Sequence, residues 1–121
     1  VACGSDAPVG ISAPVAKVPF APVVAIQQGM TRCSVWKDGN DPENVLNPSE
    51  RVSLEDMIRA YTIHGAVSNF AEDRLGSITV GKNADLIILD QDLFSIPETE
   101  IYKTNVVMTL FNGKTVHRSN L

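Results

Sequence analysis

Apolar residues recur at helical spacing in the middle of the chain and in strand-like runs toward its end. After Ser53 they follow the helical period, and Asp56 stands three residues beyond this serine. A serine cap with an acid at this spacing is typical of a helix start, so a helix is predicted from Ser53 through Phe70. The turn residues from Asp73 to Gly76 are expected to end it. Its apolar face holds Leu54, Met57, Ile58 and Tyr61.

A second helix is predicted upstream, followed by a long loop. Pro22 suits a first helical position, because the amide that proline lacks has no partner there, and apolar residues follow it to about Thr31. The residues between Cys33 and Glu50 are rich in Gly, Asn, Asp and Pro, which favour turns. We therefore expect a surface loop between the two helices.

The last third of the chain is predicted to be β structure. Residues 86–89 and 106–111 are rich in strand-forming side chains. Asn112 and Gly113 then precede another strand-like run at 114–117, and this pair tolerates the positive φ angles of a two-residue hairpin turn. Residues 97–100, between the first two runs, are expected to form one helical turn.

The first residues place a carboxylate at the end of a predicted strand. Residues 1–3 are an apolar run typical of a buried strand, and Gly4, Ser5 and Asp6 follow it. Two interpretations stay open on spacing alone. Asp6 is either a turn or cap residue, or a catalytic carboxylate of the kind that barrel enzymes carry at the carboxyl ends of their strands. An ionised aspartate can bind a cation and accept a proton from water.

The two histidines, His64 and His117, have no partner at the spacing of metal ligands. His64 lies within the helix predicted after Ser53, and His117 lies beside the predicted hairpin turn. Each is therefore interpreted as a structural residue. The sequence alone contains no complete zinc site, which ordinarily takes three or four protein ligands.

Other reactive side chains lack the setting that their chemistry needs. Ser53 and Cys33 lie outside any nucleophile-elbow sequence. Gly81 and Lys82 do not belong to a phosphate-binding glycine loop, so they are interpreted as turn residues. Cys3 and Cys33 are expected to be reduced, since two cysteines make no disulfide framework.

The formal charge of -4 comes from scattered carboxylates rather than from an acidic run. It provides no basic surface for nucleic acid, so a small molecule or a protein is the expected partner. No apolar stretch approaches the ~20 residues that cross a bilayer, and no signal-peptide pattern is visible. We expect no membrane partner and a cytoplasmic location.

Residues 76–90, GSITVGKNADLIILD, resemble the pattern GS-x-x-x-GK-x-ADL-hydrophobic-D found near the end of amidohydrolase-superfamily enzymes. The order of the remaining segments agrees, with GSDAPV at the start, SLEDMIRAYT in the middle and VVMTLFNGKTV near the close. The resemblance covers essentially the whole chain. It points to the YtcJ-like branch, also called amidohydrolase family 3.

This resemblance implies a hydrolase that cleaves a non-peptide C–N bond in an amide, formamide or cyclic amide with a metal-activated water. In this family the last barrel strand ends in GSD, and its aspartate binds the metal and handles the proton of the water. Asp6 is therefore the implied catalytic and metal-binding residue, and zinc the expected divalent metal. A tryptophan usually follows that aspartate, whereas this chain has Ala7. The other ligands would lie upstream, which leaves the substrate and the number of metal ions open.

The resemblance also implies an α/β fold divided into two partial domains. Residues 1–75 would supply the last strand and flanking helices of a (β/α)8 TIM barrel. Residues 76–121 would supply the C-terminal strands of a small composite β-sandwich, with a hairpin at 112–113. A complete barrel takes about 250 residues. We therefore expect a C-terminal portion of the enzyme that is inactive alone and binds no cofactor alone.

A function of a different class stays open beside this one. The chain would then be a non-enzymatic α+β interaction or structural module, in which Asp6 belongs to a turn and the hairpin offers an edge to a partner. An upstream strand followed by His-x-His would decide for the enzyme. In either case, strands without sheet neighbours leave open edges and apolar surface, so a homo-oligomer is expected.

Overall fold

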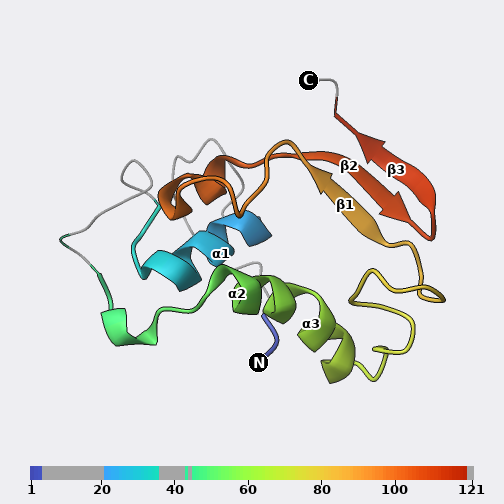
Figure 1. The fold of residues 1–121 in the computed structure, drawn as a ribbon, viewed down its shortest axis with the longest axis horizontal. Coiled ribbons are helices and arrows are strands. Elements are labelled where there is room, and N and C mark those ends of the chain that lie inside the picture. Colours follow the sequence, from blue (N-terminus) through green and yellow to red (C-terminus); the bar gives the residue numbers. More distant parts are fainter. Residues whose placement is uncertain (4–20, 36–42, 44, 120–121) are drawn as a thin grey trace, which may run out of the picture.

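The computed structural model describes residues 1–3, 21–35, 43 and 45–119, which form short helices beside a three-stranded sheet (Figure 1). In chain order the elements are α1 (Pro22–Thr31), η1 (Pro48–Glu50), α2 (Leu54–Tyr61), α3 (Ile63–Ser68), β1 (Leu86–Leu89), η2 (Glu98–Lys103), β2 (Val106–Phe111) and β3 (Lys114–Arg118). The two η elements are 3-10 helices. The predicted helix at Pro22 is confirmed, and so is the change to β structure in the last third. The TIM barrel and the composite sandwich stay predictions.

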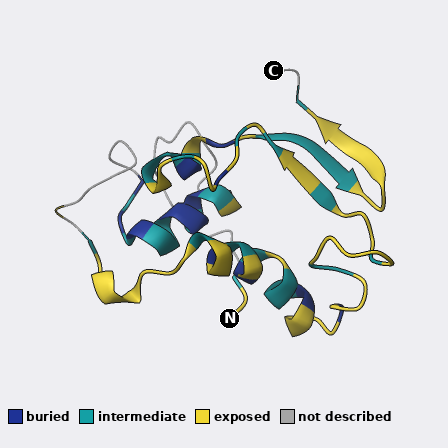
Figure 2. Ribbon diagram, viewed as in Figure 1, coloured by how far each residue is buried: buried dark blue, intermediate teal, exposed yellow. Residues whose placement is uncertain are grey.

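The core lies where α1 packs between α2 and η2 (Figure 1). A buried apolar cluster fills this region: Ile26, Met57, Leu93 and Ile101. Gln27 of α1 is also fully buried, and its side-chain oxygen accepts a hydrogen bond from the Tyr102 amide at 2.9 Å. A buried amide is tolerated when it is bonded in this way, so Gln27 joins α1 to η2 without leaving an unpaired polar group. Figure 2 shows that burial concentrates on these helices, whereas β3 is exposed along its length.

The sheet is antiparallel with the strand order β1-β2-β3. Leu86 of β1 pairs with Leu110 of β2. Between β2 and β3, Asn112 has φ 48° and Gly113 has φ 75°, and both values lie in the left-handed region that a type I′ hairpin turn requires. The predicted hairpin is therefore confirmed. The helical turn predicted at residues 97–100 is the start of η2.

The helix predicted after Ser53 begins as expected but is not continuous. The Ser53 hydroxyl accepts a hydrogen bond from the Asp56 amide at 3.1 Å and donates one to the Asp56 carboxylate at 2.7 Å. At Thr62 the backbone leaves helical geometry, with φ -124° and ψ -95°, and the threonine hydroxyl donates to the Ile58 carbonyl at 2.7 Å. The single predicted helix is therefore wrong at this point, since α2 and α3 are separate elements.

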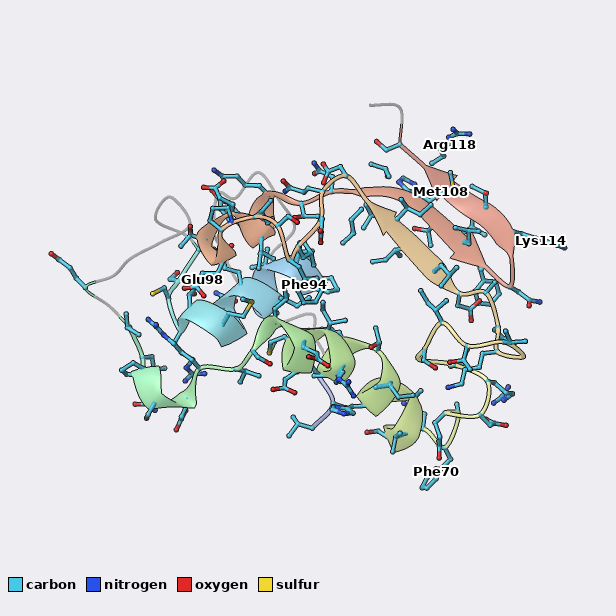
Figure 3. The ribbon with its side chains drawn as sticks, in the orientation of Figure 1. Phe70, Phe94, Glu98, Met108, Lys114 and Arg118 are labelled. Carbon is cyan, nitrogen blue, oxygen red and sulfur yellow. The ribbon has the colours of Figure 1, made fainter. Side chains whose placement is uncertain are left out.

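The second of these helices, α3, ends earlier than predicted, in a Schellman motif. The Phe70 amide donates to the Val67 carbonyl at 3.0 Å, and the Ala71 amide donates to the Ala66 carbonyl at 2.9 Å. Phe70 has φ 54° and is 90% exposed, and Figure 3 shows it beyond the end of α3. The prediction that the helix continues through Phe70 is wrong, because a left-handed residue at this position turns the chain away from the helix axis.

Residues 1–3 do not form the predicted strand. A strand needs a neighbour for its main-chain hydrogen bonds, and the part of the chain that the structure describes places helices beside these residues instead. The prediction of a strand is therefore wrong for this chain.

Candidate active-site segment

The apolar segment that leads to Asp6 is attached to α2 and α3. The Cys3 amide donates a hydrogen bond to the Ala60 carbonyl of α2 at 3.0 Å. In α3, Nδ1 of His64 lies 2.9 Å from the Val1 carbonyl oxygen. Because a carbonyl oxygen only accepts, the imidazole is the donor in this bond. The two helices together hold the main chain three to five residues before the candidate carboxylate.

Cys3 and Tyr61 both pack against the core cluster. Burial raises the pKa of the Tyr61 phenol above its ordinary value of 10.0, and the neighbouring Cys3 thiol raises it further. The phenol is therefore protonated at neutral pH and can donate a hydrogen bond. Both cysteines are free in this structure.

Asp6 itself, with Gly4, Ser5 and Ala7, lies outside the described residues. Its catalytic and metal-binding roles therefore stay predictions. Within residues 1–3, 21–35, 43 and 45–119, no three His, Cys, Asp or Glu side chains gather closely enough to hold a metal ion. The described residues therefore do not form a metal-binding site by themselves.

The histidines occupy the structural positions that their spacing indicates. His64 uses Nδ1 to hold the Val1 carbonyl, and His117 lies on the exposed strand β3, paired with Thr109. They belong to separate parts of the fold, α3 and the outer strand of the sheet (Figure 1). Neither imidazole belongs to a group of three possible metal ligands among the described residues.

The other reactive side chains also have structural roles. The Ser53 hydroxyl caps α2 and is engaged with Asp56, so it is not placed as a nucleophile. Gly81 has φ 94°, and Nζ of Lys82 donates to the Leu75 carbonyl at 3.2 Å. Both residues therefore shape the turn before β1, as predicted. Cys33 is buried at 4% exposure and bonds the end of α1.

The acidic residues of the ADLIILD segment fasten the sheet, a role that the sequence pattern did not reveal. The Asp85 carboxylate accepts a hydrogen bond from the Asn112 amide in the hairpin turn at 2.6 Å. The Asp90 carboxylate accepts from the Asn105 amide at 2.8 Å and from its side-chain nitrogen at 2.6 Å. A carboxylate at each end of β1 therefore fixes this strand to β2. The regular spacing of Asp85 and Asp90 around an apolar run was the signal available for finding them.

An open groove of about 780 Å³ lies between α2 and the sheet. Ile58 and Tyr61 line it from α2, and Ile87 and Leu110 line it from β1 and β2. Most of the lining is apolar, and Asn83 and Asp85 add polar groups at its side. The Asp85 carboxylate is already engaged with the hairpin, so these residues form a hydrophobic surface rather than a set of converging catalytic groups.

A sequence model described as the amidohydrolase family matches residues 1–117 of the chain. The match includes the GSD segment, the capped helix and the GSITVGKNADLIILD segment. The chain belongs to the amidohydrolase family. The resemblance drawn from the motifs is thereby confirmed.

Several curated relatives resemble this amidohydrolase chain over different lengths. The Bacillus subtilis protein YtcJ is 29% identical over 117 residues, which are 97% of this chain and 20% of YtcJ. An imidazolonepropionase from Bacteroides thetaiotaomicron is 38% identical over 63 residues, 52% of this chain and 15% of the relative. An N-substituted formamide deformylase from Arthrobacter pascens is 34% identical over 68 residues, 56% of this chain and 12% of the relative. The chain thus spans a fifth or less of the length of these relatives.

Among solved structures, an amidohydrolase from Thermotoga maritima is similar to this amidohydrolase chain. It is 30% identical, the similarity covers 59% of this chain and 17% of that one, and the TM-score is 0.49. Across the described part of the chain, no helix has the length and apolar character that crossing a bilayer requires.

Proposed function

We propose that this chain is the C-terminal portion of a metal-dependent amidohydrolase that hydrolyses a non-peptide C–N bond in a small molecule. The observation that carries the proposal is the family match over residues 1–117, which includes the GSD segment. The names of two relatives, a formamide deformylase and an imidazolonepropionase, agree with an amide, formamide or cyclic amide as the substrate class.

In this proposal Asp6 binds a divalent metal, zinc, and accepts the proton of the attacking water before passing it to the leaving nitrogen. A zinc ion supplies Lewis acidity and lowers the pKa of its water. In this proposal the remaining ligands come from residues outside this chain, as the family resemblance implies, and the described residues gather no set of three ligands. The chain alone would therefore bind no zinc and would have no hydrolase activity.

The part of the structure nearest this chemistry is the attachment of residues 1–3. In the complete enzyme these residues would be the last barrel strand, and α2 and α3 would lie on the outside of the barrel. The bonds from Cys3 to Ala60 and from His64 to Val1 occupy main-chain groups that a barrel strand would pair with its neighbours, so the barrel arrangement is supported by the family match alone. Residues 76–121 would complete a composite β-sandwich with strands from elsewhere in the enzyme.

The test is Asp6→Asn in the complete enzyme that carries this chain. Asparagine keeps the size of the side chain, but it is a poor metal ligand and does not accept a proton at neutral pH. General base catalysis usually accelerates a reaction by about a hundredfold to ten-thousandfold. The kcat of the variant should therefore fall by at least about a hundredfold, with little change in melting temperature. Metal content measured alongside would separate loss of the ligand from loss of the base.

A matched control is Asp73→Asn, because Asp73 is exposed and its carboxylate oxygen lies 3.7 Å from Nε of the neighbouring Arg74. This variant should retain the kcat of the unmodified enzyme. If Asp6 had only a structural role in a turn, its replacement by asparagine would also be tolerated, because asparagine favours turns. A kcat within about threefold of the unmodified enzyme for Asp6→Asn would therefore remove this residue from the mechanism.

A further inference from the structure

The turn between β2 and β3 consists of Asn112 and Gly113, the one Asn-Gly pair in the sequence. Asparagine is among the thermolabile residues of proteins. The carbonyl carbon of its side chain can be attacked by the main-chain nitrogen of the next residue. Glycine allows the closest approach because it has no Cβ atom. Every other asparagine in the sequence precedes a larger residue or proline, so this pair is the least hindered site for the reaction.

The turn is open to water, which the reaction also needs. Asn112 and Gly113 are both exposed, and so are the neighbouring residues Phe111 and Lys114. Figure 3 shows Lys114 at the end of the hairpin, pointing away from the rest of the molecule. Solvent therefore reaches the Asn112 side chain, and a leaving group can diffuse away from it.

The residues before β1 hold both main-chain amides of this turn. The Asn112 amide donates to Oδ1 of Asp85 at 2.6 Å, and the Gly113 amide donates to the Ala84 carbonyl at 3.0 Å. We call these two hydrogen bonds the turn clamp. The bond to Asp85 is the stronger kind, because its acceptor is charged. The bond to Ala84 engages the Gly113 nitrogen, which is the atom that would attack the asparagine side chain.

We propose that Asn112 is a site of spontaneous deamidation, which the turn clamp suppresses and which opens when β1 separates from the hairpin. The Gly113 nitrogen gives its proton to a hydroxide ion and forms a bond to Cγ of Asn112. The bond from Cγ to the side-chain nitrogen breaks, and this nitrogen takes a proton from water and leaves as ammonia. Water then opens the cyclic imide at either carbonyl, giving aspartate or isoaspartate. The net reaction consumes one water and needs no oxidant, reductant or enzyme.

Either product weakens the turn clamp. An aspartate at position 112 brings a second negative charge close to the Asp85 carboxylate, and like charges in one site repel each other. An isoaspartate lengthens the main chain within a two-residue turn, where the φ angles of 48° and 75° fit the hairpin. Modification should therefore loosen the attachment of β1 to the turn irreversibly.

The first experiment compares the unmodified 121-residue chain in its folded state with the same chain in guanidinium chloride. Both are incubated at mildly alkaline pH, and peptide mapping by mass spectrometry locates the modified residue. In denaturant, Asn112 should react before any other asparagine. In the folded chain it should react at least about tenfold more slowly, because local opening must come first. Mapping is needed because the Asp38–Gly39 pair can form the same imide.

Two variants separate the turn clamp from the stability of the sheet as a whole. Asp85→Ala removes the charged acceptor and should accelerate the reaction of folded Asn112 by about tenfold or more. Asp90→Ala is the matched control, because the Asp90 carboxylate lies at the other end of β1 and bonds Asn105. It should change the rate by less than about threefold. In denaturant all three chains should react at the same rate.

Three results would overturn the proposal. If Asn112 showed no preference in denaturant, it would not be the reactive site. If it reacted equally fast in the folded chain, the clamp would give no protection. Equal acceleration by both variants would assign the protection to the sheet as a whole. If circular dichroism shows that Asp85→Ala does not fold, hydrogen exchange of the Gly113 amide in the unmodified chain decides. Slow exchange supports the clamp, and exchange as fast as in an unfolded chain contradicts it.

Discussion

Gly76, the first glycine of the GSITVGKNADLIILD segment, stands where a side chain has no room. Its φ is +84°, and a Cβ atom built there would lie 2.7 Å from Cα of Ile63 and 2.8 Å from Cβ of Ala66. The Ile63 atom is main chain at the start of α3, and the Ala66 atom lies on the buried face of this helix. Neither atom is at the end of a flexible side chain, so neither can move aside easily. Gly76→Ala should therefore strain the turn and push it away from α3.

Two costs add in this variant. A left-handed φ costs a non-glycine residue roughly 1–2 kcal/mol. Forcing an extra carbon into a packed contact costs about 1–3 kcal/mol more. The free energy of unfolding should therefore fall by roughly 2–5 kcal/mol, which is a large part of the stability of a small domain.

Two further glycines provide matched controls. Gly81 has φ +94° but nothing within 4 Å of its built Cβ, so Gly81→Ala should lose only the roughly 1–2 kcal/mol of backbone strain. Gly65 lies inside α3 and is also open, so Gly65→Ala should stabilise the chain by about 0.5–1 kcal/mol.

Urea unfolding followed by circular dichroism, at one fixed chain concentration, would measure all three variants. A fixed concentration is needed because any dimer adds stability by mass action. The expected order of stability is Gly65→Ala, the unmodified chain, Gly81→Ala and Gly76→Ala. If Gly76→Ala and Gly81→Ala lost the same free energy, the close approach of the turn to α3 would contribute nothing and the reasoning would be refuted.

Substitutions at three other positions and one titration test separate parts of the structure. Ser53→Ala removes the cap of α2 and should lower the unfolding free energy by about 1 kcal/mol in urea titrations, whereas Ser53→Thr should retain most of it. Phe70→Gly relieves a left-handed phenylalanine that is 90% exposed, so it should raise the unfolding free energy by about 1 kcal/mol, and a loss would contradict the Schellman geometry. The Ser95 hydroxyl and then the Phe94 amide lower the pKa of Asp92 below its ordinary value of 3.8. Its contribution to stability is therefore present above that value and lost as pH falls through the lowered pKa, and Asp92→Asn should flatten this part of a pH–stability profile. Calorimetric titration with zinc should show no stoichiometric site on the chain, and a one-to-one site of submicromolar affinity would contradict this expectation.

Elements with local signals could be predicted from the residues alone. Ser53 and Asp56 form a cap through two bonds within one turn, and Asn112 with Gly113 supplies the positive φ angles of the hairpin. Such signals depend on neighbouring residues, so no knowledge of packing is needed. Family membership was also accessible, because the GSITVGKNADLIILD segment could be matched as a string.

Other features depend on contacts between residues distant in sequence, which can overrule local preference. No glycine or proline lies next to Thr62 to indicate the end of a helix, yet the backbone leaves helical geometry there. Phe70 occupies a left-handed position where glycine or asparagine is the ordinary signal, so the end of α3 could not be placed from its sequence. The apolar side chains of residues 1–3 predict a strand. A strand also needs a neighbouring strand for its main-chain hydrogen bonds, so these residues alone do not determine whether one forms.

The same reason governs the candidate site and the hairpin turn. Asp6 is identified by a motif, but a metal centre needs ligands brought together by a fold, and the described residues bring no three together. The sequence indicates a turn at Asn112 and Gly113. Only the tertiary hydrogen bonds show that Asp85 and Ala84 hold the two amides of this turn. Composition defines which groups are present, and tertiary hydrogen bonding decides which of them remain free to react.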